Sequence, residues 1–179
     1  MRTYKTEGII IKRTNFGEAD KIITVFTKNH GKLRALGKGI RRIASRRAPH
    51  LELFNYASIF LREGRNFDQI TEAQIINSYQ EVKRDLGKIR AAYFVCELID
   101  SLCPEKLVNR QVFELFLNFF NDLNKSNSGY YRNLCQEFAK ELVAQLGYLQ
   151  REKLSFNFDI INFVESIIER KLKTRKLWT

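Results

Sequence analysis

The feature that most constrains the fold of this chain is a change of hydrophobic period after Tyr79. Before it, five short runs are rich in β-branched residues or alternate apolar with polar side chains, and turn-forming residues separate most of them. The expected strands span residues 6–13, 21–27, 32–36, 53–62 and 68–76. After Tyr79, apolar residues recur every three or four positions, which is the period of amphipathic helices.

Five short strands joined mostly by tight turns predict a small closed barrel. The long gap between residues 37 and 49 falls between the third and fourth strands, where the oligonucleotide-binding (OB) barrel places a helix or a long loop. We therefore predict an α+β protein with an OB-fold domain over residues 1–80 and an all-α domain over residues 81–179.

Four helices are expected in the second half. Pro104 ends the first, which has one apolar face from Ile89 to Cys103. The second, near residues 112–123, is apolar nearly all round and is expected to be buried in the bundle core. Gly147 follows the third, and a fourth runs from Ile160 to Leu172 with Asn157 or Asp159 as its N-cap.

Positive charge is concentrated in the first half of the chain. The whole sequence has a net charge of +11, yet no carboxylate occurs between Asp20 and Glu52. A surface that serves only solubility normally mixes both signs, so this segment favours binding to a polyanion such as nucleic acid. Its stretch from Ile40 to Ser45 is too short and too polar for an interfacial membrane helix. The candidate phosphate contacts are Lys32, Arg34, Lys38, Arg41, Arg42, Arg46 and Arg47.

Aromatic residues of the first half are candidates for stacking on bases. Most of them are expected in the barrel interior, which needs large side chains. Phe16, beside Gly17 in a turn, is the best candidate for an exposed ring. The six considered are Phe16, Phe26, Phe54, Tyr56, Phe60 and Phe67.

The sequence contains no pattern of catalytic or metal-binding residues. The three cysteines, at positions 96, 103 and 135, form no C-x-x-C pair and are expected to be buried thiols. Glu18 and Asp20 are the only paired carboxylates near the basic segment, and a role in the turn and strand start fits them better than metal binding. We expect no enzyme activity, no catalytic residue, no cofactor, no metal and no small-molecule substrate.

An ordered series of short motifs resembles the RecO family of bacterial DNA repair and recombination mediators. The series is densest in residues 7–47 and continues with Thr71-Glu72-Ala73 and Leu146-Gly147-Tyr148-Leu149. Its main pieces are Glu7-Gly8-Ile9-Ile10-Ile11, Gly17-Glu18-Ala19-Asp20-Lys21-Ile22, Phe26-Thr27, His30-Gly31-Lys32-Leu33, Gly37-Lys38-Gly39-Ile40-Arg41-Arg42 and Ser45-Arg46. The segment from Glu169 to Arg175 is similar to the C-terminal part of the family.

The resemblance implies a protein that binds single- and double-stranded DNA and anneals complementary strands. It also implies contact with the acidic C-terminal tail of single-stranded-DNA-binding protein, and cooperation with RecR in loading RecA. It adds Lys12, Arg13 and Lys21 to the candidate DNA contacts. With no apolar run long enough for a membrane span and no apolar stretch in residues 1–7, we expect a cytoplasmic, nucleoid-associated protein without membrane contact.

The chain departs from the family at one place. Many members have a four-cysteine zinc module after the Leu-Gly-Tyr-Leu stretch, whereas no cysteine follows Cys135 here, which we interpret as a short form of the family. Two alternatives stay open. The same charges would suit an RNA-binding or ribosome-associated OB protein. They would also suit an interaction scaffold, in which the phenylalanine-rich helix 112–123 supplies an apolar groove and the basic segment captures an acidic peptide tail.

Overall fold

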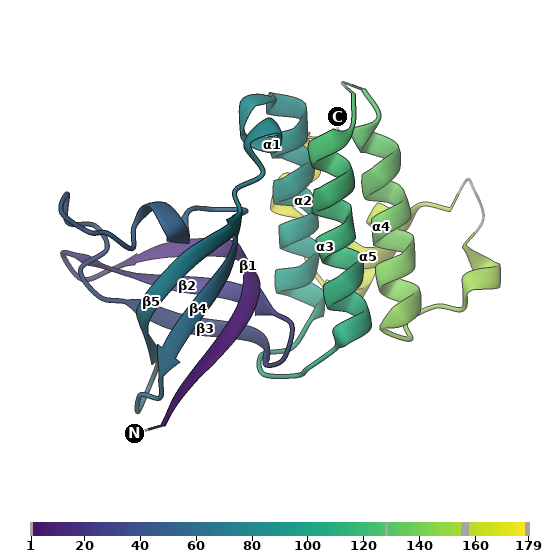
Figure 1. Cartoon of the computed structure of the whole chain (residues 1–179). Coiled ribbons are helices and arrows are strands. Elements are labelled where there is room, and N and C mark those ends of the chain that lie inside the picture. The colour runs from purple at the N-terminus through teal and green to yellow at the C-terminus, as the bar shows by residue number, and fades with distance from the viewer. Residues whose placement is uncertain (1, 128, 155–157, 178–179) are drawn as a thin grey trace. The chain divides into compact units, whose positions relative to one another are not determined.

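A computed structural model describes residues 2–127, 129–154 and 158–177. It divides the chain into two compact units (Figure 1). The first comprises residues 1–79 together with 103–110, and the second comprises residues 80–102 and 111–179. The inclusion of residues 103–110 in the first unit is a feature that the sequence did not indicate.

The first unit is a closed five-stranded barrel, as predicted (Figure 1). Its strands are β1 (Thr3–Phe16), β2 (Asp20–Thr27), β3 (Gly31–Gly37), β4 (Tyr56–Arg62) and β5 (Asp68–Asn77). The order around the barrel is β1-β2-β3-β5-β4, with β4 returning to β1. The parallel pairing of β3 with β5 through Ala35 and Leu36 closes it, and the other pairs are antiparallel. This five-stranded closure is the OB-fold arrangement.

Alternation of side chains fills the barrel interior with apolar groups from every strand. The buried core includes Ile10, Ile23, Leu33, Ile59 and Ile70. Ile40 and Leu51, from the connection between β3 and β4, are buried in the same core. This connection contains only a short 3-10 helix at Pro49–Leu51, so it is a long loop rather than a helix.

The fourth strand begins later than the sequence suggested, at Tyr56 rather than Leu53. The chain turns at Phe54, whose φ is 69°. The backbone N–H of Phe54 donates to the carbonyl of Ile10 at 2.9 Å. Because the residues before Tyr56 make this turn after the 3-10 helix, β4 is shorter than the β-rich stretch of sequence that predicted it.

The second unit is a bundle built around α2 (Leu86–Leu102), α3 (Arg110–Lys125) and α4 (Tyr131–Gln145). The rings of Phe116 and Phe119 on α3 pack against Phe138 on α4, and the thiol of Cys135 on α4 faces the carbonyl of Ala91 on α2. Phe113, Phe116, Phe119 and Phe120 are at most 4% exposed, so the expected core role of this helix is confirmed. All three cysteines are buried and unpaired, also as expected.

The second unit also contains two short α-helices, and two 3-10 helices at Arg151–Lys153 and Lys173–Leu177. The sequence did not predict α1 (Gln80–Arg84), which covers little more than one turn. The last helix, α5 (Ile160–Ile168), is shorter than the expected Ile160–Leu172 because Glu169 adopts a left-handed conformation with φ 54°. Asp159 is its N-cap and accepts a hydrogen bond from the backbone N–H of Asn162, whereas Asn157 lies outside the described residues.

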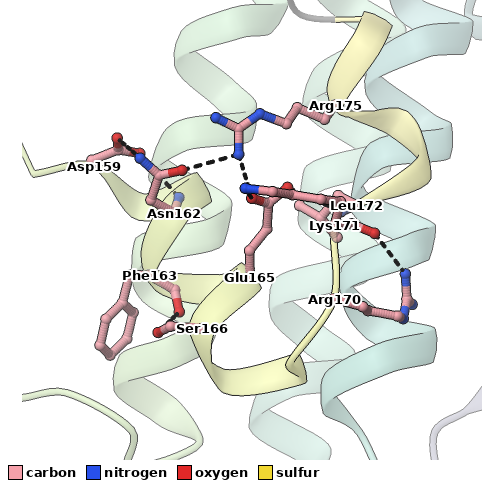
Figure 2. Close-up of polar contacts among 9 residues, drawn as sticks. All are labelled: Asp159, Asn162, Phe163, Glu165, Ser166, Arg170, Lys171, Leu172 and Arg175. Atoms are coloured by element: carbon pink, nitrogen blue, oxygen red, sulfur yellow. Dashed lines mark hydrogen bonds and ion pairs between the residues drawn. The ribbon is translucent and has the colours of Figure 1, made fainter.

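The chain beyond α5 is held by two carboxylates of the second unit, Glu165 and Glu97. Glu165, only 5% exposed at its side chain, accepts the backbone N–H of Leu172 and pairs with Lys171 and Arg175 (Figure 2). Glu97 on α2 accepts the backbone N–H groups of Lys173 and Thr174, both at 2.9 Å. These contacts fix the strongly basic C-terminal segment, and its arginines at 170 and 175 are therefore engaged in ion pairs.

Candidate nucleic-acid interface

The basic loop, defined here as residues 38–47, is tied to the β1–β2 turn. The backbone N–H of Gly39 donates to a carboxylate oxygen of Asp20 at 2.7 Å. The N–H of Arg41 donates to the carbonyl of Ala19 at 3.0 Å, and Ile40 between them is buried in the barrel core. Asp20 thus accepts a loop hydrogen bond at the start of β2, which agrees with the structural role expected for it.

Arg47 closes the other end of the basic loop. Its guanidinium donates to the carbonyl of Lys38 at 2.6 Å and also to the carbonyl of Ile70 on β5. The side chain is partly buried. Arg47 was predicted as a phosphate contact, but its donors are directed at backbone carbonyls, so the structure gives it a scaffolding role.

The cations between these two ends point to solvent. Lys38, Arg41, Arg42 and Arg46 are all exposed, and the loop has no carboxylate of its own. Arg41 donates to the carbonyl of Gly17 at 3.2 Å, which leaves other donors of its guanidinium available. The loop is therefore a held, one-signed surface of the kind that neutralises several phosphates.

A second cationic region lies on the outer face of β1, β2 and β3. The strand register places Lys12 opposite Thr24 and Thr24 opposite Arg34, so the three form one row across the sheet. Lys12 and Arg34 are exposed at the two ends of that row. The guanidinium of Arg34 lies over the ring of Phe67, 5.4 Å from its centroid, and pairs with Glu105 at 3.8 Å.

A pair of aromatic rings borders this row. Phe16 is 45% exposed, as predicted, and its ring meets Phe67 edge-on with centroids 6.2 Å apart. Phe67 follows the β4–β5 turn and is partly exposed. Arg34, Phe67 and Phe16 thus form a continuous series of planar groups, which is the type of surface on which bases stack.

The other aromatic candidates are placed differently. Phe26 and Phe54 are at most 4% exposed and belong to the core. Tyr56 is partly buried and donates a hydrogen bond to Glu7 at 2.8 Å. Phe60 is 41% exposed and lies under the ammonium of Lys5. Phe67 was one of the six candidates, although Phe16 was the one expected to be exposed; the position of Phe67 directly after Gly64-Arg65-Asn66 was the signal available for it.

Arg13 and Lys21 lie close to the basic loop. Arg13 forms an ion pair with Glu52 and its side chain is only 15% exposed. Partial burial lowers the pKa of Lys21, and the neighbouring charges of Arg13 and Arg41 lower it further. The carboxylate of Glu52, which pairs with Arg13, raises the pKa of Lys21 in part.

Lys32 is the predicted contact that does not reach the surface. It is only 6% exposed, because residues 105–106 pair with it: the N–H of Lys106 donates to its carbonyl at 2.9 Å. Its charge lies near Cys103, where burial raises the thiol pKa to about 12 and Lys32 lowers it in part. Lys32 and Arg34 share one side of β3 as expected, yet only Arg34 is exposed, so a phosphate contact by Lys32 is not supported.

A pocket of about 380 Å³ in the second unit bears on the alternative of a peptide groove. Its apolar lining includes Leu115, Phe119 and Phe138. Three carboxylates line it against two cations: Asp122, Glu137 and Glu141 against Lys140 and Arg151. Because both cations are paired with carboxylates of this same set, the pocket does not suit an acidic tail.

The fold and this surface define a class: an OB-fold protein with a basic, partly aromatic face, joined to a helical domain. Comparison with known protein families agrees with this class and identifies a particular family. The model "Recombination protein O N terminal" matches residues 1–79, and "Recombination protein O C terminal" matches residues 83–151. The chain belongs to the RecO family.

Curated relatives carry the name DNA repair protein RecO. The protein of Roseiflexus sp. (strain RS-1) is 37% identical over 123 residues, which are 69% of this chain and 43% of the relative. That of Dehalococcoides mccartyi (strain ATCC BAA-2266) is 32% identical over 146 residues, 81% of this chain and 56% of the relative. That of Acetivibrio thermocellus is 32% identical over 148 residues, 83% of this chain and 59% of the relative. The chain thus spans about half the length of these relatives.

The described residues contain neither a cluster of metal ligands nor a membrane-spanning helix. Nowhere in residues 2–127, 129–154 and 158–177 do three or more histidine, cysteine or acidic side chains gather as a metal site would require. Within the same ranges, no helix has the length and apolar character needed to cross a bilayer.

Proposed function

We propose that this chain is a DNA repair and recombination mediator that binds single- and double-stranded DNA through its barrel. The observation that carries the proposal is the basic loop, held at both ends and with four exposed cations, in a chain of the RecO family. Lys38, Arg41, Arg42 and Arg46 would bind phosphates, with Lys12, Arg13, Lys21 and Arg34 as further contacts.

Strand annealing follows from the same electrostatics. Two single strands repel each other, and a fixed row of cations reduces that repulsion while it leaves the base edges free to pair. Such a reaction makes and breaks no covalent bond, so we propose that the protein acts without enzyme chemistry. Its place of action would be the cytoplasmic nucleoid.

The partners implied by the family belong to the proposal as well. We infer that the chain works with RecR to load RecA on strands coated by single-stranded-DNA-binding protein. The acidic tail of that protein would find its complement in the basic loop rather than in the carboxylate-lined pocket of the second unit. Tail and DNA would then compete for the same arginines, which a displacement titration can detect.

The experiment that tests the proposal is fluorescence-monitored annealing of complementary oligonucleotides across a salt series. We expect annealing well above the uncatalysed rate at low salt and a steep decline as salt rises. Absence of both binding and annealing in dilute buffer would refute the proposal. Competition between DNA and RNA strands of the same sequence separates it from the RNA-binding alternative.

The stacking surface has its own test. Replacing Phe16 and Phe67 together by alanine should weaken single-strand binding about 10- to 100-fold, at about 1–3 kcal/mol per stacked base with partial use of each ring. Phe60→Ala is the matched control, because that ring is exposed on β4 to a similar degree. Equal losses for the control and the double variant would remove Phe16 and Phe67 from the interface.

A further inference from the structure

The basic loop has a fully exposed apolar side chain. Ile43 is 108% exposed, that is, more accessible than in an extended reference peptide. Arg41, Arg42 and Arg46 are exposed on either side of it in the sequence. Ile40, three residues earlier, is by contrast 2% exposed and anchors the loop in the barrel core.

Isolated exposed apolar residues are common on proteins, and the setting of Ile43 is what distinguishes it. The loop is held at one end by Asp20 and the core position of Ile40, and at the other by the two carbonyl contacts of Arg47. Backbone hydrogen bonds from Arg42 to Gly39 and from Ser45 to Arg42 fold the intervening turn. Ile43 is thus presented at the apex of a preformed turn rather than on a loose segment.

We propose that Ile43 is a wedge that inserts between neighbouring bases of the nucleic acid bound by the basic loop. The inference rests on the proposed DNA-binding function. Arginines that bind phosphates on both sides bring the backbone to the loop, and the apolar groups nearest to that backbone are the faces of the stacked bases. Branched aliphatic side chains in such positions partly unstack a base step, and packing of the side chain against the separated bases offsets the cost of unstacking.

An anionic membrane is the other surface that could bind a loop with arginines on both sides of an exposed apolar side chain. Affinity for a bilayer scales with the apolar area buried, and a single isoleucine in a loop otherwise rich in arginine supplies little. A base step needs only one small side chain. The size of the apolar tip therefore favours nucleic acid.

A wedge has a specific consequence for annealing. Hairpins within each single strand must open before the two strands can pair, whereas unstructured strands need no such step. Ile43 would lower the cost of opening by taking the place of one base in the stack. Its effect should therefore appear on hairpin-forming strands and be absent on unstructured ones.

The test compares Ile43→Ala with the wild-type full chain in annealing of two strand pairs, one hairpin-forming and one unstructured. We expect Ile43→Ala to slow the hairpin-forming pair about tenfold, equivalent to about 1.4 kcal/mol, and to change the unstructured pair less than twofold. Ala44→Ser is the matched control, since Ala44 is the exposed neighbour of Ile43. This control should anneal both pairs at the wild-type rate.

A direct readout uses a hairpin with 2-aminopurine in its stem, whose fluorescence rises when the base unstacks. Wild type should raise it on binding, and Ile43→Ala should bind the hairpin without that rise. Equal fluorescence for the two proteins, or equal slowing of both strand pairs, would overturn the wedge while the proposed function stands. Failure of the wild type to bind or anneal any strand would instead refute the proposed function itself.

The last measurement is binding to vesicles that contain anionic lipid. We expect wild type and Ile43→Ala to bind them equally weakly. If the substitution abolishes vesicle binding and leaves the 2-aminopurine signal intact, the tip serves a membrane and the wedge is refuted.

Discussion

Removing the three exposed arginines of the basic loop gives the sharpest test of the proposed binding of nucleic acid. Arg41, Arg42 and Arg46 are exposed, and backbone contacts, Asp20 and Arg47 hold the loop. The Arg41 side chain adds only an exposed hydrogen bond to the carbonyl of Gly17. The triple alanine variant should therefore fold normally. Arg47 is left in place, because its two carbonyl contacts make it part of the scaffold.

The magnitude follows from counterion release. Each phosphate contact on a single strand adds about 0.7 to the slope of log K against log salt concentration. Three lost contacts should flatten that slope by about 2, so that affinity at 0.1 M salt falls about 100-fold and the difference vanishes near 1 M. If these arginines do not contact phosphates, their removal would leave the slope unchanged.

The assay is fluorescence anisotropy of a labelled single strand at five or more salt concentrations. The matched control is the triple variant Arg90→Ala, Lys125→Ala and Lys153→Ala, which removes three exposed cations from the second unit and lowers the net charge equally. If control and loop variants lose the same slope, overall charge and not the basic loop governs binding. Parallel lines for loop variant and wild type would refute the reasoning outright.

Three further predictions concern the scaffold. Arg47→Ala leaves the carbonyl of Ile70 without its guanidinium donor, so we expect the free energy of unfolding measured in urea to fall by about 2 kcal/mol. The control Arg46→Ala should leave that free energy almost unchanged. Burial raises the pKa of Glu97, but hydrogen bonds from residues 170–174 lower it more, and the net pKa is lowered. A lowered folded-state pKa stabilises the protein at pH values above the unfolded pKa of about 4.3. Glu97→Gln should therefore lower the free energy of unfolding by about 1–2 kcal/mol at neutral pH. Unfolding curves recorded at decreasing pH should show this difference from wild type shrinking below that pKa. Gly31→Ala places a Cβ 2.2 Å from the carbonyl oxygen of Leu107 at a φ of +65°. Gly17→Ala is the control, because Gly17 has a similar φ of +58° but no atom within 4 Å of the added Cβ. Gly31→Ala should lower the melting temperature more than the control does, and equal shifts would show that the contact with residue 107 is unimportant.

Local sequence determined the elements of this protein. The β-rich run of 21–27, the alternation in 32–36 and the helical period after Tyr79 are properties of neighbouring residues, so the barrel and the bundle could be predicted from them. The carboxylate-free segment was equally visible, because charge is a property of composition. Errors fell where a single backbone conformation overrides the pattern, as at Glu169, whose left-handed φ ends α5 before Leu172.

The tertiary structure alone decided what each cation in that segment does. Arg47 is directed at the carbonyl of Ile70, 23 residues away, while Lys32 is buried by residues 105–106 and Arg34 stacks on Phe67. These partners come from distant positions in the chain, and nothing near an arginine in the sequence says whether its donors face solvent or a carbonyl. Hydrogen bonding and burial are set by the packed neighbours, whereas period and charge are set by the residues themselves.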